Sequence, residues 1–342
     1  MKTKKAAFPK TLHDAIKYFA DEDRALDFMR SIRWPDGVVK CPICGSTEVS
    51  FLSTRRIWKC KQAHEKRQFS VKVGTVLEDS PIKLDKWLCA FWLIANAKNG
   101  ISSYELHRSI GVTQKTAWFM LHRIRLSMQD GSVEKMQGRV EADETYIGGK
   151  ARNMHKGKRQ RGSGSVGKIA VLGLLERNTG KRVSRVRCKI VERVRRQQLD
   201  SEVRKNVEKG STVYTDAFMS YNRLADEYTH KVIDHAECYA KGHVHTNGLE
   251  NFWSLLKRGI KGTYVSVESF HLFRYLDEQA FRFNERKDTD AGRFVKVLRG
   301  IIGKGLRYAK LTGKTDNDRP PKPTPPSWTT KWLLSDLGWE SL

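Results

Sequence analysis

Three acidic residues that lie far apart along the chain are placed where a fold could bring them together. Asp143 and Asp216 fall in segments with strand character, and Glu250 lies on a predicted helix over residues 247–258. Carboxylate oxygens suit Mg²⁺ or Mn²⁺, and converging acids repel one another unless cations lie between them. Two such ions, about 3.5–4 Å apart, can activate an attacking oxygen and stabilise a leaving oxygen in a phosphodiester displacement. These three acids are therefore candidate ligands of a metal site for that chemistry.

The helix that carries Glu250 is predicted to have one apolar and one polar face. The apolar face consists of Leu249, Phe252, Trp253 and Leu256. The polar face consists of Asn247, Glu250, Ser254 and Lys257. The apolar set has the spacing of a helix packed on a core. The polar set could be part of a catalytic site, and an ordinary solvated helix surface would explain it equally well. Lys257, two turns beyond Glu250, could neutralise a phosphate at the site.

A second candidate metal site combines three cysteines and a histidine. Cys41, Cys44, Cys60 and His64 follow the spacing Cys-x2-Cys-x15-Cys-x3-His. Zn²⁺ favours four sulfur and nitrogen ligands in a tetrahedron, and two turns of a small β-hairpin supply them as two close pairs. The pattern predicts a structural zinc ribbon, and the alternative is three buried free thiols beside a surface histidine. Three of the six cysteines are scattered, which does not fit a disulfide framework and favours a reducing compartment.

The segments that carry the three acids alternate between strand and helix patterns. One strand is predicted to begin at Arg139, and four more are predicted over 168–175, 185–190, 212–216 and 231–234. Helices are predicted over 196–209, from Ala217 onward and over 247–258. Three antiparallel strands followed by helix, strand, helix and strand predict a mixed α/β sheet whose first and fourth strands are neighbours. This order matches the ribonuclease H-like fold by analogy. In that sheet, Asp143 and Asp216 would lie on adjacent strands.

Helical patterns dominate the part of the chain before this sheet. Short helices are expected within residues 8–33, and longer ones within 81–129. Ser102 can form a capping box with Glu105, Gly111 would end that helix, and Thr113 would cap the next. The second helix is predicted to point Trp118, Leu121 and Ile124 inward and Arg123 and Arg125 outward. The pair is typical of a DNA-reading helix-turn-helix, or of an ordinary helical hairpin between two domains.

Composition limits the class of partner. The 342 residues carry 64 Lys and Arg against 38 Asp and Glu, a net charge of +26. Such a surplus attracts polyanions, so nucleic acid is the expected partner. The alternative is that the chain is a ribosome-associated or merely soluble basic protein. A basic loop at 150–168 is expected to bind phosphate or to be a solvated hairpin tip. The longest apolar run, Trp87–Ala95, is far shorter than the ~20 residues that span a bilayer. We expect no membrane partner, no export signal, and a cytoplasmic location with nucleoid association on DNA.

The motifs together resemble a known family. They are Trp34–Gly37, Cys41–Gly45, Glu141–Gly149, Tyr214–Tyr221 and His245–Arg258. In combination they resemble the bacterial insertion-sequence transposases of the DDE superfamily, in the zinc-ribbon group related to eukaryotic Merlin elements. The resemblance covers about residues 8–290. It implies a multidomain α+β protein with a zinc ribbon, a helix-turn-helix and a ribonuclease H-like mixed α/β catalytic domain.

The resemblance also implies roles for individual residues. Asp143, Asp216 and Glu250 match the catalytic triad, and Lys257 matches the basic residue seven positions after it. Some members use Asn as the third catalytic residue, so Asn247, one turn before Glu250, is the alternative. Glu141, on the same strand face as Asp143, is the reserve candidate for the first position. His64 stands where many relatives have cysteine.

The implied activity is the movement of a DNA element, with double-stranded DNA as the partner. Water would free 3′ hydroxyls at the terminal inverted repeats, and these hydroxyls would attack target DNA at one metal site. Joining two ends predicts a homodimer or a higher assembly on DNA. Two other functions compete with this one: a zinc-ribbon and helix-turn-helix DNA-binding regulator whose ribonuclease H-like domain is inactive, and a structure-selective nuclease of the same fold.

These patterns divide the chain into four predicted regions. Residues 1–75 would hold N-terminal helices and the zinc ribbon, and 76–135 the helix-turn-helix. Residues 136–290 would form the catalytic domain, and 291–342 a basic, Pro-rich C-terminal tail.

Overall fold

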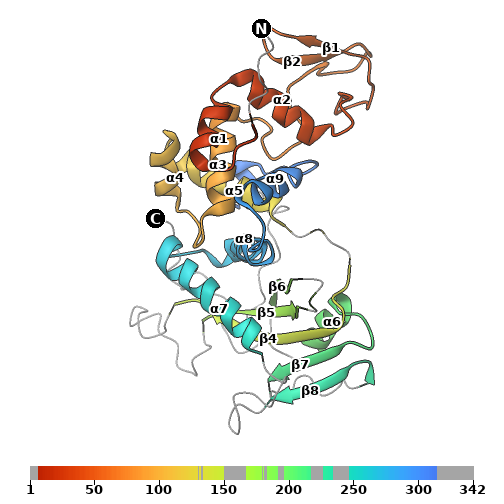
Figure 1. Ribbon diagram of the computed structural model, residues 1–342, viewed down its shortest axis with the longest axis vertical. Coiled ribbons are helices and arrows are strands. Elements are labelled where there is room, and N and C mark those ends of the chain that lie inside the picture. The colour runs from red at the N-terminus through yellow and green to blue at the C-terminus, as the bar shows by residue number, and fades with distance from the viewer. Residues whose placement is uncertain are drawn as a thin grey trace. The chain divides into compact units, whose positions relative to one another are not determined.

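The computed structural model (Figure 1) describes part of the chain in detail. The described residues are 7–129, 131, 134–149, 167–178, 180, 183–191, 196–216, 226–233 and 246–313, with only the backbone of Arg196, Asp216 and Ile233. They form two compact units, one of residues 7–129 and 288–313 and the other of residues 131–287. Most of the predicted basic loop at 150–168, and the helix predicted from Ala217, lie outside the described residues.

The first unit opens with two short helices, as predicted. They are α1 (Leu12–Phe19) and α2 (Glu22–Arg33). Thr11 begins α1 with a capping box, in which its side chain accepts from Asp14 N–H and the Asp14 carboxylate bonds back to Thr11. Phe19 is fully buried and lies 5.1 Å from the Phe28 ring, which joins the two helices through an apolar contact.

A small antiparallel sheet follows. Its strands are β1 (Val49–Leu52), β2 (Ile57–Cys60) and β3 (Gln68–Phe69), in the order β1-β2-β3. Trp58 on β2 is buried and forms the centre of an aromatic cluster with Trp34, Phe51 and Phe69. A sheet of this size has little core of its own, so this cluster supplies most of its apolar packing.

Three helices come next, α3 (Leu84–Asn96), α4 (Ser103–Ile110) and α5 (Gln114–Ser127). The predicted caps are confirmed. Ser102 and Glu105 form a capping box, and Thr113 accepts from Thr116 N–H at the start of α5. Gly111 ends α4 with φ +60°, a left-handed conformation that glycine adopts without steric cost.

The prediction that Arg123 and Arg125 point outward is wrong. Both are buried, with 7% and 1% of their surface exposed. Arg123 donates from Nε to Leu306 O at 3.1 Å and from Nη1 to Glu78 O at 2.7 Å, and its guanidinium lies 4.4 Å from the Phe119 ring. Leu306 follows 183 residues later in the chain. The local helical pattern therefore could not indicate that this face of α5 is covered.

The prediction of a tail from residue 291 is wrong for residues 291–313. This segment contains α9 (Asp290–Arg299) and α10 (Tyr308–Leu311), which belong to the first unit. Phe294 is fully buried, stacks on Phe28 at 5.7 Å and contacts Trp92 in a tilted arrangement at 5.0 Å. Apolar residues at helical spacing in this basic segment drive its packing, because burying a phenylalanine offsets the ordering of the helix.

The second unit contains the predicted mixed α/β sheet (Figure 1). Its strands are β4 (Arg139–Ile147), β5 (Ile169–Glu176), β6 (Arg185–Val191), β7 (Thr212–Asp216) and β8 (Thr229–Ile233). Their order is β6-β5-β4-β7-β8, antiparallel among β4, β5 and β6 and parallel from β4 through β7 to β8. The first and fourth strands of the sheet are therefore neighbours.

The register fixes where the acids fall on the strands. Asp143 is paired with Gly173 of β5. On the other side of β4, Glu141 is paired with Tyr214 of β7. Asp143 and Asp216 each lie two residues beyond this last pair, at corresponding positions along two parallel strands.

Helices cover both faces of this sheet. On one face, α6 (Arg196–Asn206) packs Leu199 and Val203 against Val140 and Ala142. On the other, α7 (Asn247–Gly259) packs against β4 and β5 with the four predicted apolar residues, Leu249, Phe252, Trp253 and Leu256. A π-helical turn η5 (Ile260–Tyr264), a 3-10 turn η6 (Ser269–His271) and α8 (Leu272–Asn284) follow α7.

The approach of α7 to the sheet depends on a missing side chain. A Cβ placed on Gly173 would lie 2.5 Å from Cζ2 of Trp253 and 2.9 Å from Cδ2 of Leu249. The Trp253 ring therefore lies directly over the Gly173 backbone. Any larger residue in the middle of β5 would push α7 away from β4.

We expect Gly173→Ala to lower the free energy of unfolding by about 1–3 kcal/mol, because an added methyl overpacks this contact. Urea denaturation of this variant, of a control variant and of the wild type measures the change in the free energy of unfolding. Gly149→Ala is the matched control, since no atom lies within 4 Å of its added Cβ. Equal unfolding midpoints for the two variants would contradict the tight contact.

Candidate active site and metal centre

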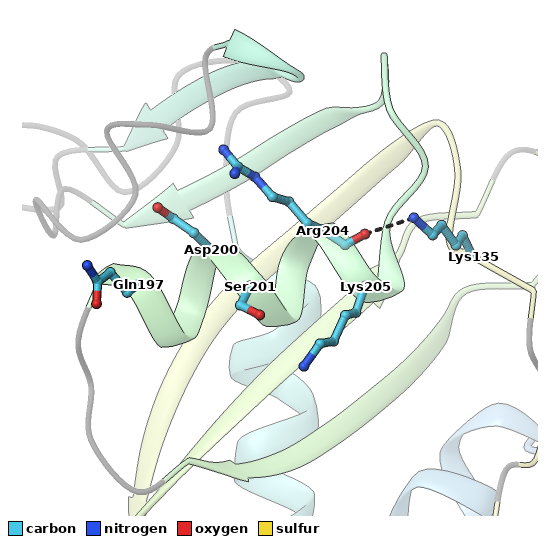
Figure 2. Close-up of a pocket in the computed structure, with 6 residues that line it drawn as sticks. All are labelled: Lys135, Gln197, Asp200, Ser201, Arg204 and Lys205. Carbon is cyan, nitrogen blue, oxygen red and sulfur yellow. Dashed lines mark hydrogen bonds between the residues drawn. The ribbon is translucent and has the colours of Figure 1, made fainter.

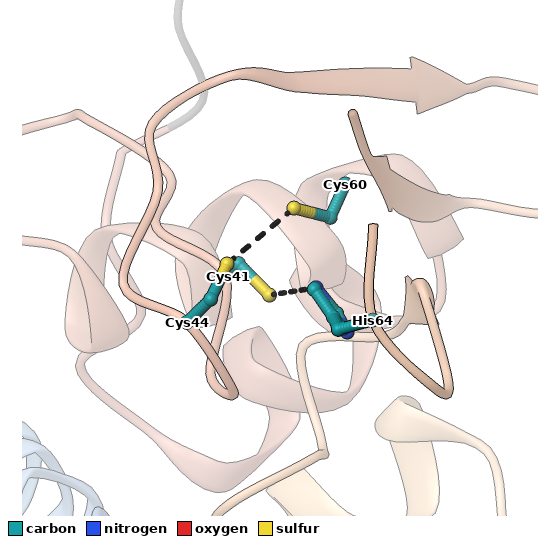
Figure 3. A group of neighbouring side chains, drawn as sticks. All are labelled: Cys41, Cys44, Cys60 and His64. Carbon is teal, nitrogen blue, oxygen red and sulfur yellow. Dashed lines mark hydrogen bonds between the residues drawn. The ribbon is translucent and has the colours of Figure 1, made fainter. Parts of the chain in front are cut away.

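The four predicted zinc ligands converge (Figure 3). The ligand atoms of Cys41, Cys44, Cys60 and His64 all lie within 4.8 Å of one another. Cys41 Sγ is 3.4 Å from His64 Nε2, and Cys44 Sγ is 3.6 Å from Cys60 Sγ. Ligands about 2.0–2.3 Å from a tetrahedral zinc ion stand about 3.3–3.8 Å apart. The cluster therefore fits a structural zinc ion, with His64 as the fourth ligand.

The surroundings of the cluster prepare it for a cation. The other ring nitrogen of His64, Nδ1, lies 2.6 Å from Glu65 O. Donation from Nδ1–H would leave Nε2 free to bind metal. Burial of the Cys41 thiol opposes its ionisation. Hydrogen bonds from the backbone N–H groups of Cys44 and Ile43, together with those of the Cys44 and Cys60 side chains, outweigh burial and lower the pKa of Cys41 to about 7. The tight first loop thus favours the thiolate, which is the form that binds zinc.

Asp143 is held by the helix that covers the sheet. Its Oδ2 accepts a hydrogen bond of 2.9 Å from Trp253 Nε1 on α7. Its Oδ1 accepts one of 2.8 Å from the backbone N–H of Glu144. Asp143 is only partly buried, so its carboxylate is oriented while still accessible.

Lys257 comes into the electrostatic range of Asp143. The lysine is partly buried on α7, and burial lowers its pKa, an effect that the negative charge of Asp143 opposes and that Lys261 and Lys168 reinforce. Lys257 therefore lies near one carboxylate and two further lysines. This arrangement is suited to binding an anion such as a phosphate.

The other predicted residues on α7 are exposed. Asn247 begins the helix, and Glu250 lies in its first turn. Glu250, Trp253 and Lys257 follow at i, i+3 and i+7, so Glu250 is one turn before the residue that donates to Asp143. Asp216 ends β7, two residues beyond the last residue of β7 that is paired with β4, and its side chain lies outside the described atoms.

Glu141, the reserve candidate, is buried rather than accessible. Only 1% of its side chain is exposed. Its Oε1 accepts from Arg177 Nε at 2.7 Å, and its Oε2 accepts from the backbone N–H of Leu249 at 2.9 Å. Both carboxylate oxygens are engaged by protein groups.

Sequence reasoning missed the polar role of Trp253. We predicted it only as part of the apolar face of its helix, and the structure confirms that burial. Its indole N–H also needs a partner when buried, and Asp143 is that partner. The signal that could have found it is the glycine inside the otherwise apolar segment 168–175, which marks a close approach to a strand.

A separate cleft lies along α6 (Figure 2). It is lined by Lys135, Gln197, Asp200, Ser201, Arg204 and Lys205, and Lys135 Nζ donates to Arg204 O at 2.8 Å. Two of its cations are paired with acids, Arg204 with Glu227 and Lys205 with Glu202. Because α6 and α7 cover opposite faces of the sheet, this cleft is not part of the candidate active site.

Among the described residues, no helix combines the length and the apolar character needed to cross a bilayer.

Known protein families match both the zinc-ribbon region and the mixed-sheet region of this chain. An ISXO2-like transposase domain matches residues 135–284, and a transposase zinc-ribbon domain matches residues 20–64. An uncharacterized protein of the transposable element ISH50 from Halobacterium salinarum is 32% identical over 307 residues, which cover 85% of this chain and 99% of that protein. An uncharacterized transposase-like protein from Haemophilus influenzae is 35% identical over 122 residues, which cover 34% of this chain and 96% of that protein.

The zinc ribbon, the mixed sheet and these matches together define a DDE-type transposase. More narrowly, the chain belongs to the insertion-sequence transposases that join a zinc ribbon to an ISXO2-like transposase domain. The family expected from the sequence motifs is thereby confirmed.

We expect Cys41→Ser to reduce bound zinc well below about one ion per chain, because structural zinc needs four ligands. Metal analysis of the purified protein measures the content, and hydrogen exchange should rise within residues 41–69. Cys89→Ser is the matched control, since this half-buried cysteine is not part of the cluster. Unchanged zinc in Cys41→Ser would refute the assignment.

Proposed function

We propose that this transposase cuts and joins DNA at one metal site, with Asp143, Asp216 and Glu250 as the ligands of two Mg²⁺ or Mn²⁺ ions. The observation that carries this proposal is the packing of α7 on β4, in which Trp253 holds the Asp143 carboxylate. The parallel pairing of β4 with β7 supports it, because Asp143 and Asp216 fall at corresponding positions. Glu250 is one helical turn from the Asp143 contact.

A ribonuclease H-like fold for the second unit is part of this proposal. Three antiparallel strands are followed by two parallel ones, with the fourth strand beside the first. That order pairs the first residues of β4 with the first residues of β7, and both strands run on in the same direction to Asp143 and Asp216. In this arrangement, acids from separate parts of the chain converge without any local motif.

The bound ions and the side chains of this site would have separate roles in the reaction. The bound ions would supply an activated attacking oxygen and stabilise the leaving one. Trp253 Nε1 keeps Asp143 Oδ2 in one orientation, and Lys257 with Lys168 and Lys261 would neutralise the phosphate. The same site would serve hydrolysis at the element ends and transfer of the 3′ hydroxyls to target DNA.

The first unit is proposed to bind the terminal inverted repeats. The zinc ribbon and the pair α4–α5 would form its DNA contacts, with α4–α5 acting as a helix-turn-helix. In such motifs the N-terminal residues of the second helix contact base edges, and Lys115 is exposed there. Arg123 and Arg125 are buried and would not contact DNA. Joining two ends requires two active sites, so we expect a homodimer or higher assembly on DNA.

We expect Asp216→Ala to abolish Mg²⁺-dependent strand transfer while leaving affinity for the terminal repeat nearly unchanged, because the first unit binds the repeat. An oligonucleotide transfer assay and a binding titration at fixed salt measure the two properties. Asp226→Ala, an exposed acid of the same unit, is the matched control. Wild-type protein that binds repeats but never nicks DNA would favour the DNA-binding regulator. Wild-type protein that cuts DNA but never joins ends would favour the structure-selective nuclease.

A second comparison decides the third catalytic residue. We expect Glu250→Gln to abolish transfer and Asn247→Ala to retain most of it, because a carboxylate binds Mg²⁺ more strongly than an amide oxygen. Transfer rates are compared across a Mg²⁺ titration. The reverse order of the two variants would assign the role to Asn247.

A further inference from the structure

The Glu141 carboxylate lies at the point where α7 meets the sheet. Its Oε2 accepts from Leu249 N–H, in the first turn of α7, at 2.9 Å. The first four N–H groups of a helix have no partner within the helix, and Thr246, which precedes α7, makes no side-chain cap. A carboxylate from β4, 108 residues away along the chain, therefore performs part of the capping.

The same carboxylate connects α7 to β7. Arg177, just beyond β5, donates to Glu141 Oε1 at 2.7 Å, and its guanidinium lies 4.1 Å from the centroid of the Tyr214 ring on β7. Tyr214 is buried and is paired with Glu141 across the two strands. One buried ion pair thus links β4, β7 and α7, the three elements that carry Asp143, Asp216 and Glu250.

Gly248 allows the first turn of α7 to pack closely against the Glu141 carboxylate. A Cβ on Gly248 would lie 2.8 Å from Glu141 Oε2 and 3.1 Å from Leu175 Cδ2. The absence of a side chain there allows the first turn of α7 to reach the carboxylate. The turn that is held in this way carries both Asn247 and Glu250.

We infer that Glu141 is a positioning residue, which together with Arg177 sets the first turn of α7, and with it the third catalytic residue, against β4 and β7. It is not a metal ligand, because both of its oxygens are engaged and its side chain is 1% exposed. This inference rests on the proposed function for its catalytic consequence. The capping of α7 itself can be tested without any catalysis.

The matched control is a second ion pair in the same sheet whose acid is also buried. Glu176 accepts from Arg185 Nε, and its side chain is 6% exposed. Its neighbours Leu172 and Leu174 belong to the core cluster beneath α6, on the opposite face from α7. Glu176→Gln therefore removes a similar buried charge without changing the contact with α7.

The experiment compares Glu141→Gln with Glu176→Gln in the full-length protein. We expect Glu141→Gln to lower the strand-transfer rate about 10- to 100-fold at saturating Mg²⁺, a typical loss for an outer-shell partner, with unchanged affinity for the terminal repeat. Hydrogen exchange should rise in the peptide that covers residues 246–256. Glu176→Gln should leave both the rate and this exchange at wild-type values.

A second variant keeps the test decisive if Glu141→Gln does not fold. Arg177→Lys retains the charge but loses the planar contact with Tyr214, so the same changes should appear in a smaller degree. Wild-type exchange over 246–256 and a wild-type rate in Glu141→Gln, or in Arg177→Lys where Glu141→Gln does not fold, would overturn the inference. Inactive wild-type protein would defeat the proposed function alone, and hydrogen exchange would still decide the role of Glu141.

Discussion

The contact between α7 and β4 is the constraint on which the second unit depends. Two hydrogen bonds cross it, from Leu249 N–H to Glu141 and from Trp253 Nε1 to Asp143, and both join residues more than 100 positions apart. Glycines at 173 and 248 allow the helix to come this close. In a buried setting, each of these polar groups would be costly without its partner, so the contact specifies one register of the helix on the sheet.

Packing and chemistry use the same residues at this contact. Trp253 fills the core of the second unit with its ring and orients a candidate metal ligand with its N–H. An apolar face usually holds a helix in place without determining its chemistry. Here the same face also orients an acid, so a change that disturbs the core is expected to disturb the site as well.

The first unit depends on different forces. Its small sheet has the Trp58 cluster and four candidate zinc ligands, Cys60 at the end of β2 and the other three in loops. A metal there would stabilise a fold that is too small for a large core. The helices that follow this sheet pack against α9 and α10 at residues 290–311, which come much later in the chain. This packing buries Phe294 and covers the face of α5 that carries Arg123.

The sequence by itself determined the features that depend on near neighbours. The zinc ligands lie within 24 residues, the caps of α4 and α5 within three, and the two faces of α7 follow from helical spacing. The order of strands also predicted that β4 and β7 are neighbours. Only the tertiary structure decided that Trp253 bonds Asp143, that Glu141 caps α7 and that Arg123 is buried. Each of these depends on a partner 108 to 183 residues away, and periodicity over a few residues carries no information about such a partner.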